Sequence, residues 1–301
     1  MFSKATNKQS IKTKTTDMLK TRLLQVRLLS GKILRGQLMG LLAFLLVPVL
    51  TFGQLPQGFT QKKLTQDVIN EATCMAHAAD GRIFVAERSG SVKVFQNGLL
   101  STVHQVQTTT DAEQGLLGIT LHPDFAANGK CYLFYTNQQR SRHYLDVIGI
   151  TPANTVNSVT RVMQFDSILN GNHNGGALLF KDGYLYIAIG DSNRPVFAPQ
   201  LDTYRGKILW LLDNGEPAPG NPYYNQPGAS RQRRSIWAVG FRNPWRMSLD
   251  PVSKKLFLID VGEHFEEIND ITAPAASKNY DYGWNCKYPE TTDSLKLEIK
   301  P

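Results

Sequence analysis

The amino-acid sequence predicts an all-β fold, and two observations carry that prediction. First, turn-forming residue pairs separate short runs of apolar and aromatic residues along the chain, a pattern typical of β-hairpins. These pairs include Asp80-Gly81, Asn97-Gly98 and Asp182-Gly183. Second, no segment after residue 54 shows a sustained helical period of apolar residues. Only 113–118 and 264–270 have room for a helical turn or two.

Four apolar strands recur at intervals of about 45–70 residues, which indicates repeats of one structural unit. They are FVAER, YLFYTN, YLYIAIGD and LFLIDVG, and we expect each to be an inner strand of its sheet. Short antiparallel strands in groups of about four are the signature of propeller blades. A β-sandwich is the main competing architecture, but its strands would be more evenly spaced and its loops shorter. Residues 55–301 therefore predict a β-propeller with about four to five blades.

The predicted strands follow one another between turn residues. Residues 80–98 read as strand, turn and strand, and 114–137 as strand, Pro-Asp corner, Asn-Gly turn and strand. Residues 174–191 repeat the scheme as a hairpin whose second strand is buried on both faces. Residues 206–215 add a further strand, and 235–271 hold the last set. Because blades surround a central channel, we expect residues just outside the strand ends to meet at its mouth.

Composition excludes one broad class of function. The chain has 301 residues with 42% hydrophobic and 19% charged residues, which is ordinary for a folded globular protein. Residues 1–38 carry nine Lys and Arg and one acid, which accounts for the whole formal charge of +8. The remainder of the chain is therefore neutral and lacks the electrostatic footprint of a nucleic-acid-binding protein.

Residues 1–54 predict a basic leader followed by a signal peptide. The apolar run within 38–54 contains Pro48 and is shorter than the roughly twenty residues of a bilayer span. It fits the apolar region of a secretory signal, with Gly53 at a plausible cleavage point. An uncleaved membrane anchor is the alternative. In either case we expect the folded part, 55–301, to lie outside the cytoplasm, in the periplasm or the extracellular space.

The three cysteines do not define a site. Cys74, Cys131 and Cys286 have no close C-x-x-C spacing of the kind found in metal or redox sites. One disulfide is possible in an oxidising compartment, but the sequence does not select the pair. Core packing is the simplest role for at least one of these residues.

Polar residues stand at four predicted strand ends and are candidates for a shared site. Each also has a structural interpretation: His173 as a turn residue, Arg242 in an ion pair, the amides as turn caps and the acids as a solvated loop. For the acidic loop an oxygen-ligated Ca²⁺ is the functional alternative. We interpret His122 and Asp124, in LHPDF, as a structural corner. The candidates are Gln114, Asn172, His173, Arg242, Asn243, Gly262, Glu263, Glu266 and Glu267.

Six ordered motifs in this chain resemble those of the glucose/sorbosone dehydrogenase family. They are EQGLLGITLHPDF, HNGGALLFKDGYLYIAIGD, GKILWL, IWAVGFRNPWRMSLD, DVGEHFEEIND and NYDYGWNC, and they cover roughly residues 60–290. The resemblance implies an exported six-bladed propeller that uses pyrroloquinoline quinone (PQQ) and Ca²⁺. It implies oxidation of an aldose sugar at C1 to a lactone, with an external electron acceptor and no stable membrane span. We expect the chain to be truncated after Pro301, where further blades follow in the family.

The resemblance also assigns roles to individual residues. His173, in the H-x-G-G motif, matches the general base, because an imidazole can accept a proton near neutral pH. Arg242 matches the arginine that donates to a quinone oxygen, where negative charge develops. Gln114, Asn172 and Asn243 match cofactor contacts, although an aspartate often stands in the family at the position of Asn172. Gly262 and Glu263 match a loop whose carbonyls hold the catalytic Ca²⁺, and Glu267 matches a ligand of a structural Ca²⁺.

Two other functions remain open at this level. The family includes members of the hedgehog-interacting type that bind rather than catalyse, so the chain could be a non-catalytic propeller that binds carbohydrate or protein, or an inactive fragment. A Ca²⁺-dependent lactonase on a similar propeller would need a carboxylate-rich metal site in the channel, and no such set stands out in the sequence. The preferred sugar, the electron acceptor and the oligomeric state cannot be deduced from the sequence.

Overall fold

The computed structural model describes residues 55–272, 281–284 and 294–297. The chain divides into two compact units, residues 1–62 and 63–301. Of the first unit the structure describes 55–62, which contain no helix or strand. The leader predicted for 1–54 lies outside the described residues. Every element discussed below belongs to the second unit.

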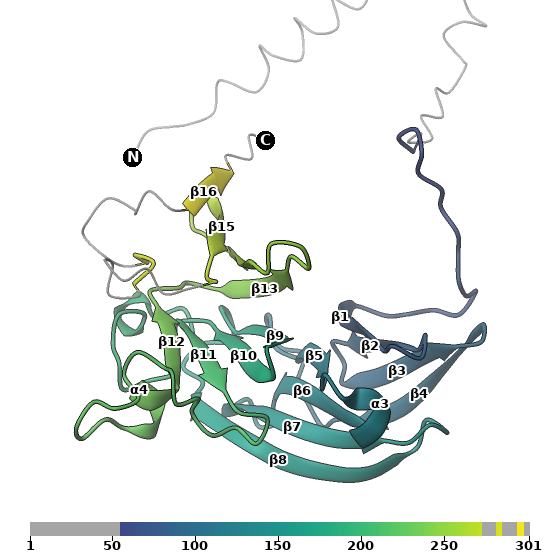
Figure 1. The fold of residues 1–301 in the computed structure, drawn as a ribbon, viewed down its shortest axis with the longest axis horizontal. Coiled ribbons are helices and arrows are strands. Elements are labelled where there is room, and N and C mark those ends of the chain that lie inside the picture. The colour runs from purple at the N-terminus through teal and green to yellow at the C-terminus, as the bar shows by residue number, and fades with distance from the viewer. Residues whose placement is uncertain (1–54, 273–280, 285–293, 298–301) are drawn as a thin grey trace, which may run out of the picture. The chain divides into compact units, whose positions relative to one another are not determined.

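The second unit consists of four antiparallel sheets of four strands each, in chain order (Figure 1). This confirms the predicted all-β propeller fold, with four blades in the described residues. The first sheet contains β1 Ala72–His77, β2 Ile83–Glu87, β3 Ser91–Gln96 and β4 Leu99–Gln105, and the second β5 Leu116–Leu121, β6 Lys130–Thr136, β7 Arg142–Ile150 and β8 Val156–Ser167. The third contains β9 Gly175–Lys181, β10 Tyr184–Ile189, β11 Lys207–Leu211 and β12 Ile236–Val239, and the fourth β13 Pro244–Leu249, β14 Leu256–Asp260, β15 Glu266–Asp270 and β16 Ser294–Leu297.

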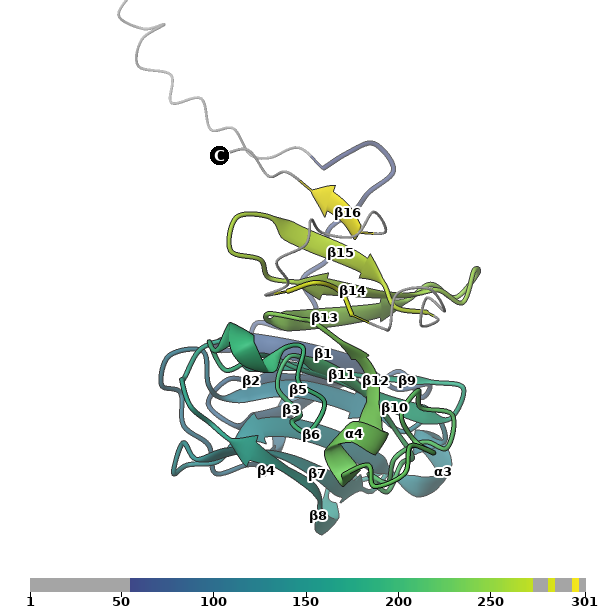
Figure 2. The ribbon, with the colours of Figure 1, turned by 90° about the vertical axis from the view of Figure 1, so that its left-hand side faces the viewer.

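The first strand of each sheet faces the neighbouring sheets at the centre of the arrangement. Strand β5 contacts both β1 and β9, and β9 also contacts β13. Figure 2 shows the same sheets from the side. The four apolar segments expected to be inner strands correspond to β2, β6, β10 and β14, each the second strand of its sheet with a strand on either side, as predicted. They are the most apolar because they pack between two strands and against adjacent sheets.

The tight turns form for the local reason that the sequence indicates. Between β9 and β10, Asp182 and Gly183 have φ angles of 52° and 82°, as a type I′ hairpin requires. Asn97 and Gly98 between β3 and β4 have φ angles of 52° and 83°. The second strand of the 174–191 hairpin is buried along almost its whole length, as predicted. Turn chemistry therefore fixes the register of these hairpins.

The helical segments are not where the sequence suggested. Residues 113–118 form a turn and the start of β5, and 264–270 are largely β15. The described helices are α3 Phe125–Asn128, the 3₁₀ helix η1 Pro195–Phe197 and α4 Arg231–Ser235. Helix α4 begins at an N-cap, since the Ser230 side chain accepts from the backbone N–H of Arg233. Such short helices lack the repeated apolar period that sequence analysis detects.

Three apolar clusters hold adjacent sheets together. One cluster joins the first and second sheets, the second joins the second and third, and the last joins the third and fourth. Phe84, Phe134 and Trp237 are representative buried residues of the three interfaces. Each blade is therefore stabilised mainly by its neighbours, because a single four-stranded sheet cannot bury both of its own faces.

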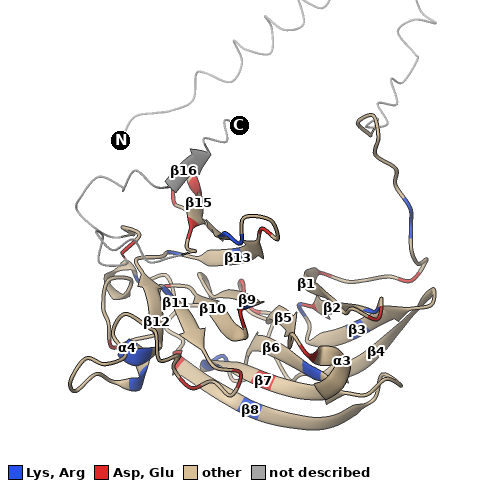
Figure 3. Cartoon of the chain, viewed as in Figure 1, with Lys and Arg blue, Asp and Glu red and all other residues tan. Residues whose placement is uncertain are grey.

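The remaining general predictions concern charge, cysteines and membrane spans. Figure 3 shows acidic and basic residues mixed over the sheets, with a basic group on α4. Of that group, Arg231 pairs with Glu216 at 3.2 Å and Arg233 pairs with Asp202. Cys74 and Cys131 form no disulfide with each other, and Cys286 lies outside the described residues. Among the residues described, no helix has the length and apolarity needed to span a bilayer.

Candidate active site

The turns that precede the first strands of the second, third and fourth sheets meet at one place. Gln114 lies before β5, His173 before β9, and Arg242 and Asn243 before β13. The carboxylate of Glu113 connects all three turns, because its Oε2 accepts from the backbone N–H of His173 at 2.8 Å and from Asn243 Nδ2 at 3.4 Å. The predicted convergence of strand ends on one region is therefore observed for these residues.

His173 is held in an unusual backbone conformation with its ring anchored. Its φ is 56°, in the left-handed region that residues other than glycine rarely occupy. The imidazole Nδ1 lies 2.7 Å from Asp191 Oδ1, and the residue is 7% exposed. A neutral imidazole whose Nδ1–H donates to this carboxylate would have Nε2 available as a proton acceptor. Such strain at a polar, anchored residue is characteristic of functional sites.

The glycines after His173 serve close packing of the backbone. A Cβ on Gly175 would lie 2.8 Å from the carbonyl oxygen of Ala188, and one on Gly176 would lie 2.8 Å from the Leu117 Cβ. A Cβ on Gly118 of the second sheet would lie 2.0 Å from the carbonyl oxygen of Gly176. These glycines let β9 pack directly against the neighbouring backbone.

Asp191 is the residue that sequence reasoning missed. It is fully buried, and its three contacts connect the candidate residues: Oδ1 to His173 Nδ1, Oδ2 to Trp284 Nε1 at 2.7 Å, and its backbone N–H to the Arg242 carbonyl at 2.8 Å. The Asn172 side chain is therefore not needed to orient the imidazole. The signal was present in the sequence, because Ile189 pairs with Gly175 in this hairpin, so the second residue after β10, Asp191, comes beside the second residue before β9, His173.

Arg242 and Asn243 are fixed through their backbones by a buried acid. Their N–H groups donate to Asp260 Oδ2 at 2.9 Å and Oδ1 at 2.7 Å. Burial raises the pKa of Asp260 to about 7, although these two hydrogen bonds favour its charged form. The Arg242 guanidinium donates to the Val261 carbonyl at 2.8 Å and lies 5.5 Å from the ring centroid of Trp284. The guanidinium is therefore held beside the Trp284 that binds Asp191.

Gln114 and Asn172, the two remaining predicted cofactor contacts, differ in burial and in hydrogen bonding. Gln114 is 1% exposed, and its Oε1 is buried without a hydrogen-bond partner among the described residues. Turning this amide toward a ligand would break no hydrogen bond of Oε1, so the residue can serve a bound polar group. Asn172 is half-buried, and its backbone N–H donates to Asn170 Oδ1 at 3.0 Å. The structure shows no comparable unmet hydrogen bond for the Asn172 side chain.

The predicted metal ligands do not form a preassembled cage. Gly262 and the exposed Glu263 lie on the loop between β14 and β15, directly after the Val261 whose carbonyl binds Arg242. Glu267, on β15, accepts from Asn269 Nδ2 at 3.3 Å. Within the described ranges no three His, Cys, Asp or Glu side chains are grouped to hold a metal ion. Ca²⁺ takes 6–8 oxygen ligands, so this loop can provide only part of such a shell.

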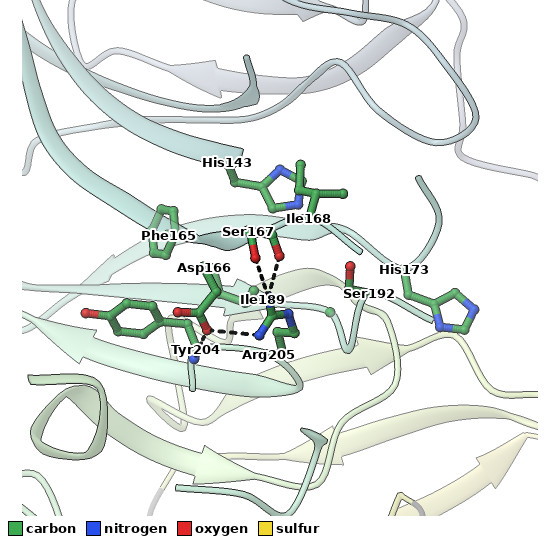
Figure 4. Close-up of a pocket in the computed structure, with 11 residues that line it drawn as sticks. His143, Phe165, Asp166, Ser167, Ile168, His173, Ile189, Ser192, Tyr204 and Arg205 are labelled. Atoms are coloured by element: carbon green, nitrogen blue, oxygen red, sulfur yellow. Dashed lines mark hydrogen bonds and ion pairs between the residues drawn. The ribbon is translucent and has the colours of Figure 1, made fainter. Parts of the chain in front are cut away.

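A small pocket lined in part by His173 lies between the second and third sheets (Figure 4). Asp166 accepts from Thr203 Oγ1 at 2.5 Å and from the Tyr204 N–H at 2.7 Å, and it pairs with Arg205 at 3.6 Å. In Figure 4 the His173 ring points away from this group. The polar groups around Asp166 and Arg205 therefore bind neighbouring protein groups and not His173.

Comparison with known proteins shows the family of this chain. A family model described as Glucose / Sorbosone dehydrogenase matches residues 69–294. The aldose sugar dehydrogenase YliI of Escherichia coli (strain K12) is 32% identical over 239 residues, covering 74% of this chain and 61% of that protein. The human Hedgehog-interacting protein is 30% identical over 208 residues, covering 58% of this chain and 29% of that protein. The chain thus spans less than two thirds of the length of either relative.

Solved structures share the fold. An oxidoreductase of Thermus thermophilus, described as a glucose dehydrogenase, has a TM-score of 0.67 and 30% identity, covering 75% of this chain and 67% of that chain. The PQQ-bound aldose sugar dehydrogenase of Streptomyces coelicolor has a TM-score of 0.64 and 24% identity, covering 77% of this chain and 67% of that chain. At that identity the second likeness shows the fold alone.

Proposed function

The chain belongs to the glucose/sorbosone dehydrogenase family, and on that premise we propose that it serves oxidation of an aldose at C1 to the lactone with PQQ as cofactor. The observation that carries the proposal is a set of contacts near the ends of β9, β10 and β13. These contacts join His173, Asp191, Trp284 and Arg242. A buried carboxylate, an anchored imidazole and a guanidinium placed together suit removal of a proton and stabilisation of developing negative charge.

The residues present fit a flat, anionic quinone. Arg242 offers a cation held beside an indole ring, and the unpartnered amide oxygen of the buried Gln114 could accept a hydrogen bond from an N–H group of the cofactor. When bound, PQQ would supply the two-electron acceptor that no side chain provides, and electrons would then pass to an external acceptor. Gln114, Asn172, Arg242 and Asn243 are the residues that we propose to hold it.

His173 is the proposed base. Its Nε2 would take the proton from the anomeric hydroxyl, while Asp191 holds Nδ1–H and stabilises the imidazolium that forms. Loss of this proton and of the C1 hydrogen as hydride turns the C1–O bond into the carbonyl of the lactone. Arg242 would donate to the oxygen on which negative charge develops during the transfer. Trp284 binds Asp191 and keeps that carboxylate in place during the reaction.

Ca²⁺ is proposed as the second cofactor, and the fit is partial. The loop at Gly262 and Glu263 adjoins Arg242 through Val261, so an ion bound there would lie near the quinone. This loop supplies few of the 6–8 oxygens that Ca²⁺ takes, so ligands from outside the loop would complete the shell of this ion. Glu267 is proposed for a separate structural ion. Bound Ca²⁺ would supply Lewis-acid polarisation.

The test is dye reduction by purified full-length chain with PQQ, Ca²⁺ and an aldose. We expect turnover, and we expect His173→Ala to lower kcat by about 10²–10⁴-fold, because a general base typically contributes that much. Asp191→Asn should also lose activity, since an amide cannot stabilise the imidazolium. Binding of PQQ, followed by its absorbance, should be nearly unchanged in both variants.

A matched histidine provides the control. His77→Ala alters an exposed residue at the end of β1 and should leave the rate unchanged. Unchanged turnover in His173→Ala would contradict the assignment of the base. Absence of PQQ binding by the folded wild type would instead favour the alternative function, a propeller that binds carbohydrate or protein, for which the Hedgehog-interacting relative provides the precedent.

Location is a separate proposal. The basic residues of 1–38 and the apolar stretch 38–54 support export of the 55–301 domain. N-terminal sequencing of the protein from periplasm or culture medium should find cleavage near residue 54. Recovery of the intact chain in the cytoplasm would contradict export.

A further inference from the structure

Lys207 is a fully buried lysine outside the set of residues discussed so far. It is the first residue of β11 and has 0% exposure. Its Nζ donates to three backbone carbonyls, of Phe197 at 2.9 Å, Ala198 at 2.7 Å and Arg205 at 2.6 Å. A lysine ammonium has three N–H donors, so all three are used. Lysine is almost never fully buried without such compensation.

The three carbonyls belong to one loop, residues 190–206, which connects β10 to β11. This loop begins at Gly190 beside Asp191 and returns at Gly206, whose N–H donates to the Gly190 carbonyl at 3.0 Å. The Lys207 ammonium therefore ties the middle of the loop, at Ala198, to its end. Without the ammonium, three carbonyls inside the protein would lose a charge-assisted hydrogen bond each.

The same loop is tied to the segment that carries Arg242. The Ala198 carbonyl accepts from both Lys207 Nζ and the Gly240 N–H, the latter at 3.1 Å. The Phe241 N–H donates to the Gly206 carbonyl at 3.3 Å, and the Asp191 N–H to the Arg242 carbonyl at 2.8 Å. The Lys207 ammonium therefore lies where two segments meet: loop 190–206, which contains Asp191, and residues 240–241, which Arg242 follows.

Strand register gives the same result independently. Lys207 pairs with Ile189 on β10 and with Val239 on β12. It therefore lies between the two strands that lead directly to Asp191 and to Arg242. The Lys207 side chain lies at the ends of these two strands and contacts loop 190–206. It therefore bears on the spacing of β10, β12 and the loop next to the candidate site.

We infer that Lys207 is a positioning residue: its ammonium acts as an internal cation that fixes loop 190–206 against residues 240–243 and thereby sets Asp191, and through it His173, relative to Arg242. The roles of these three residues rest on the proposed function, but the positioning itself does not. Burial lowers the pKa of Lys207 to about 7, while Asp281, Asp166 and Asp191 favour its charged form and Arg205 opposes it, so the ammonium predominates below that pH.

The first test is made on cofactor-free wild type, so that it does not depend on sugar oxidation. In protein with ¹⁵N-labelled lysine held below pH 7, where the Lys207 amine is mainly charged, we expect an ammonium signal that is protected from solvent exchange and coupled through hydrogen bonds to the carbonyl carbons of 197, 198 and 205. We also expect a low-field proton signal from His173 Nδ1–H bound to Asp191. Absence of the protected ammonium signal would overturn the inference whether or not the variants below fold.

The second test is rescue of a cavity variant. Lys207→Ala removes the side chain beyond Cβ, which leaves space for n-propylammonium. We expect the His173 signal to weaken or shift and kcat to fall at least tenfold with little change in KM, and n-propylammonium to restore both several-fold. Lys207→Met fills the same space without a charge and should show the defect without rescue, while Lys63→Ala, at an exposed lysine, should show neither.

The outcomes separate the two proposals. A folded Lys207→Ala protein with an unchanged His173 signal, or equal response of the Ala and Met variants to n-propylammonium, would overturn the positioning role. If the wild type binds no PQQ and oxidises no sugar while the His173 signal still depends on the ammonium, the proposed function fails and the inference stands.

Discussion

His143 lines the small pocket of Figure 4 and shows how burial can dominate the properties of a residue. It is 6% exposed, its Nδ1 is 3.1 Å from Thr136 Oγ1, and its ring centroid is 5.1 Å from that of Phe134. Burial, reinforced by the nearby charge of Arg205, lowers the pKa of His143 to about 3. The imidazole is therefore neutral in the folded protein throughout the physiological range and is distinct from His173, which is bound to a carboxylate.

This shift predicts a loss of stability in acid. The unfolded chain binds a proton at His143 below its ordinary pKa of about 6.5, whereas the folded protein does not until about pH 3, so stability falls as pH drops through this window. At pH 5 the cost is about 2 kcal/mol relative to pH 8. Urea unfolding of His143→Gln should lack this part of the pH dependence. An identical pH profile in the variant would contradict the assignment.

At the scale of elements, the β9–β10 hairpin joins local turn chemistry to the site. Its turn lies at Asp182 and Gly183, and its open end carries His173 and Asp191. Strands of six or seven residues separate the two ends by roughly 20 Å. Two glycines of this hairpin therefore have different functions: Gly183 permits the turn, and Gly190 permits close approach to His173.

Alanine substitution should separate the two functions. Gly183 has φ of 82° with open space around it, so Gly183→Ala should cost about 1 kcal/mol of stability and leave activity unchanged. A Cβ on Gly190 would lie 2.0 Å from the His173 carbonyl oxygen, so Gly190→Ala should displace His173 and reduce dye reduction more than tenfold. The low-field His173 signal of cofactor-free protein checks the displacement. Equal effects of the two substitutions on that signal would refute this distinction.

At the scale of the whole second unit, neighbouring sheets are joined by polar links as well as apolar clusters. Arg82, in the turn between β1 and β2, donates to the Thr151 carbonyl at 3.1 Å and to Asn154 Oδ1 at 2.9 Å, both between β7 and β8. Its guanidinium also lies 5.0 Å from the ring centroid of Phe125. This link fastens the first sheet to the second at the turns.

The link predicts a stability effect larger than that of a surface pair. Arg82→Met should lower the free energy of unfolding by about 2–3 kcal/mol, because the buried arginine makes charge-assisted hydrogen bonds across two sheets. Arg140→Met removes an exposed pair with Asp111 and should cost less than about 1 kcal/mol. Denaturant unfolding measures both. Equal losses would show that the link between the sheets adds nothing.

Much of the fold could be predicted because its signals are local. Alternating apolar residues and turn pairs such as Asp182-Gly183 depend on backbone conformation within a few residues, and they predicted the strands, the hairpins and about four to five blades, of which the described residues contain four. The same local signals misplaced the helical turns, because α3, η1 and α4 are too short to show a repeated apolar period.

By itself, the sequence determined the blade repeat and the presence of a histidine, an arginine and amides at the ends of strands. Only the tertiary structure decided which of these groups touch. Asp191 meets His173 across 18 residues, Glu113 meets it across 60, and Lys207 reaches the carbonyls of a loop that folds back on itself. The reason is physical: hydrogen-bond partners are fixed by distances of about 3 Å, and such distances between remote residues exist only after the sheets have packed.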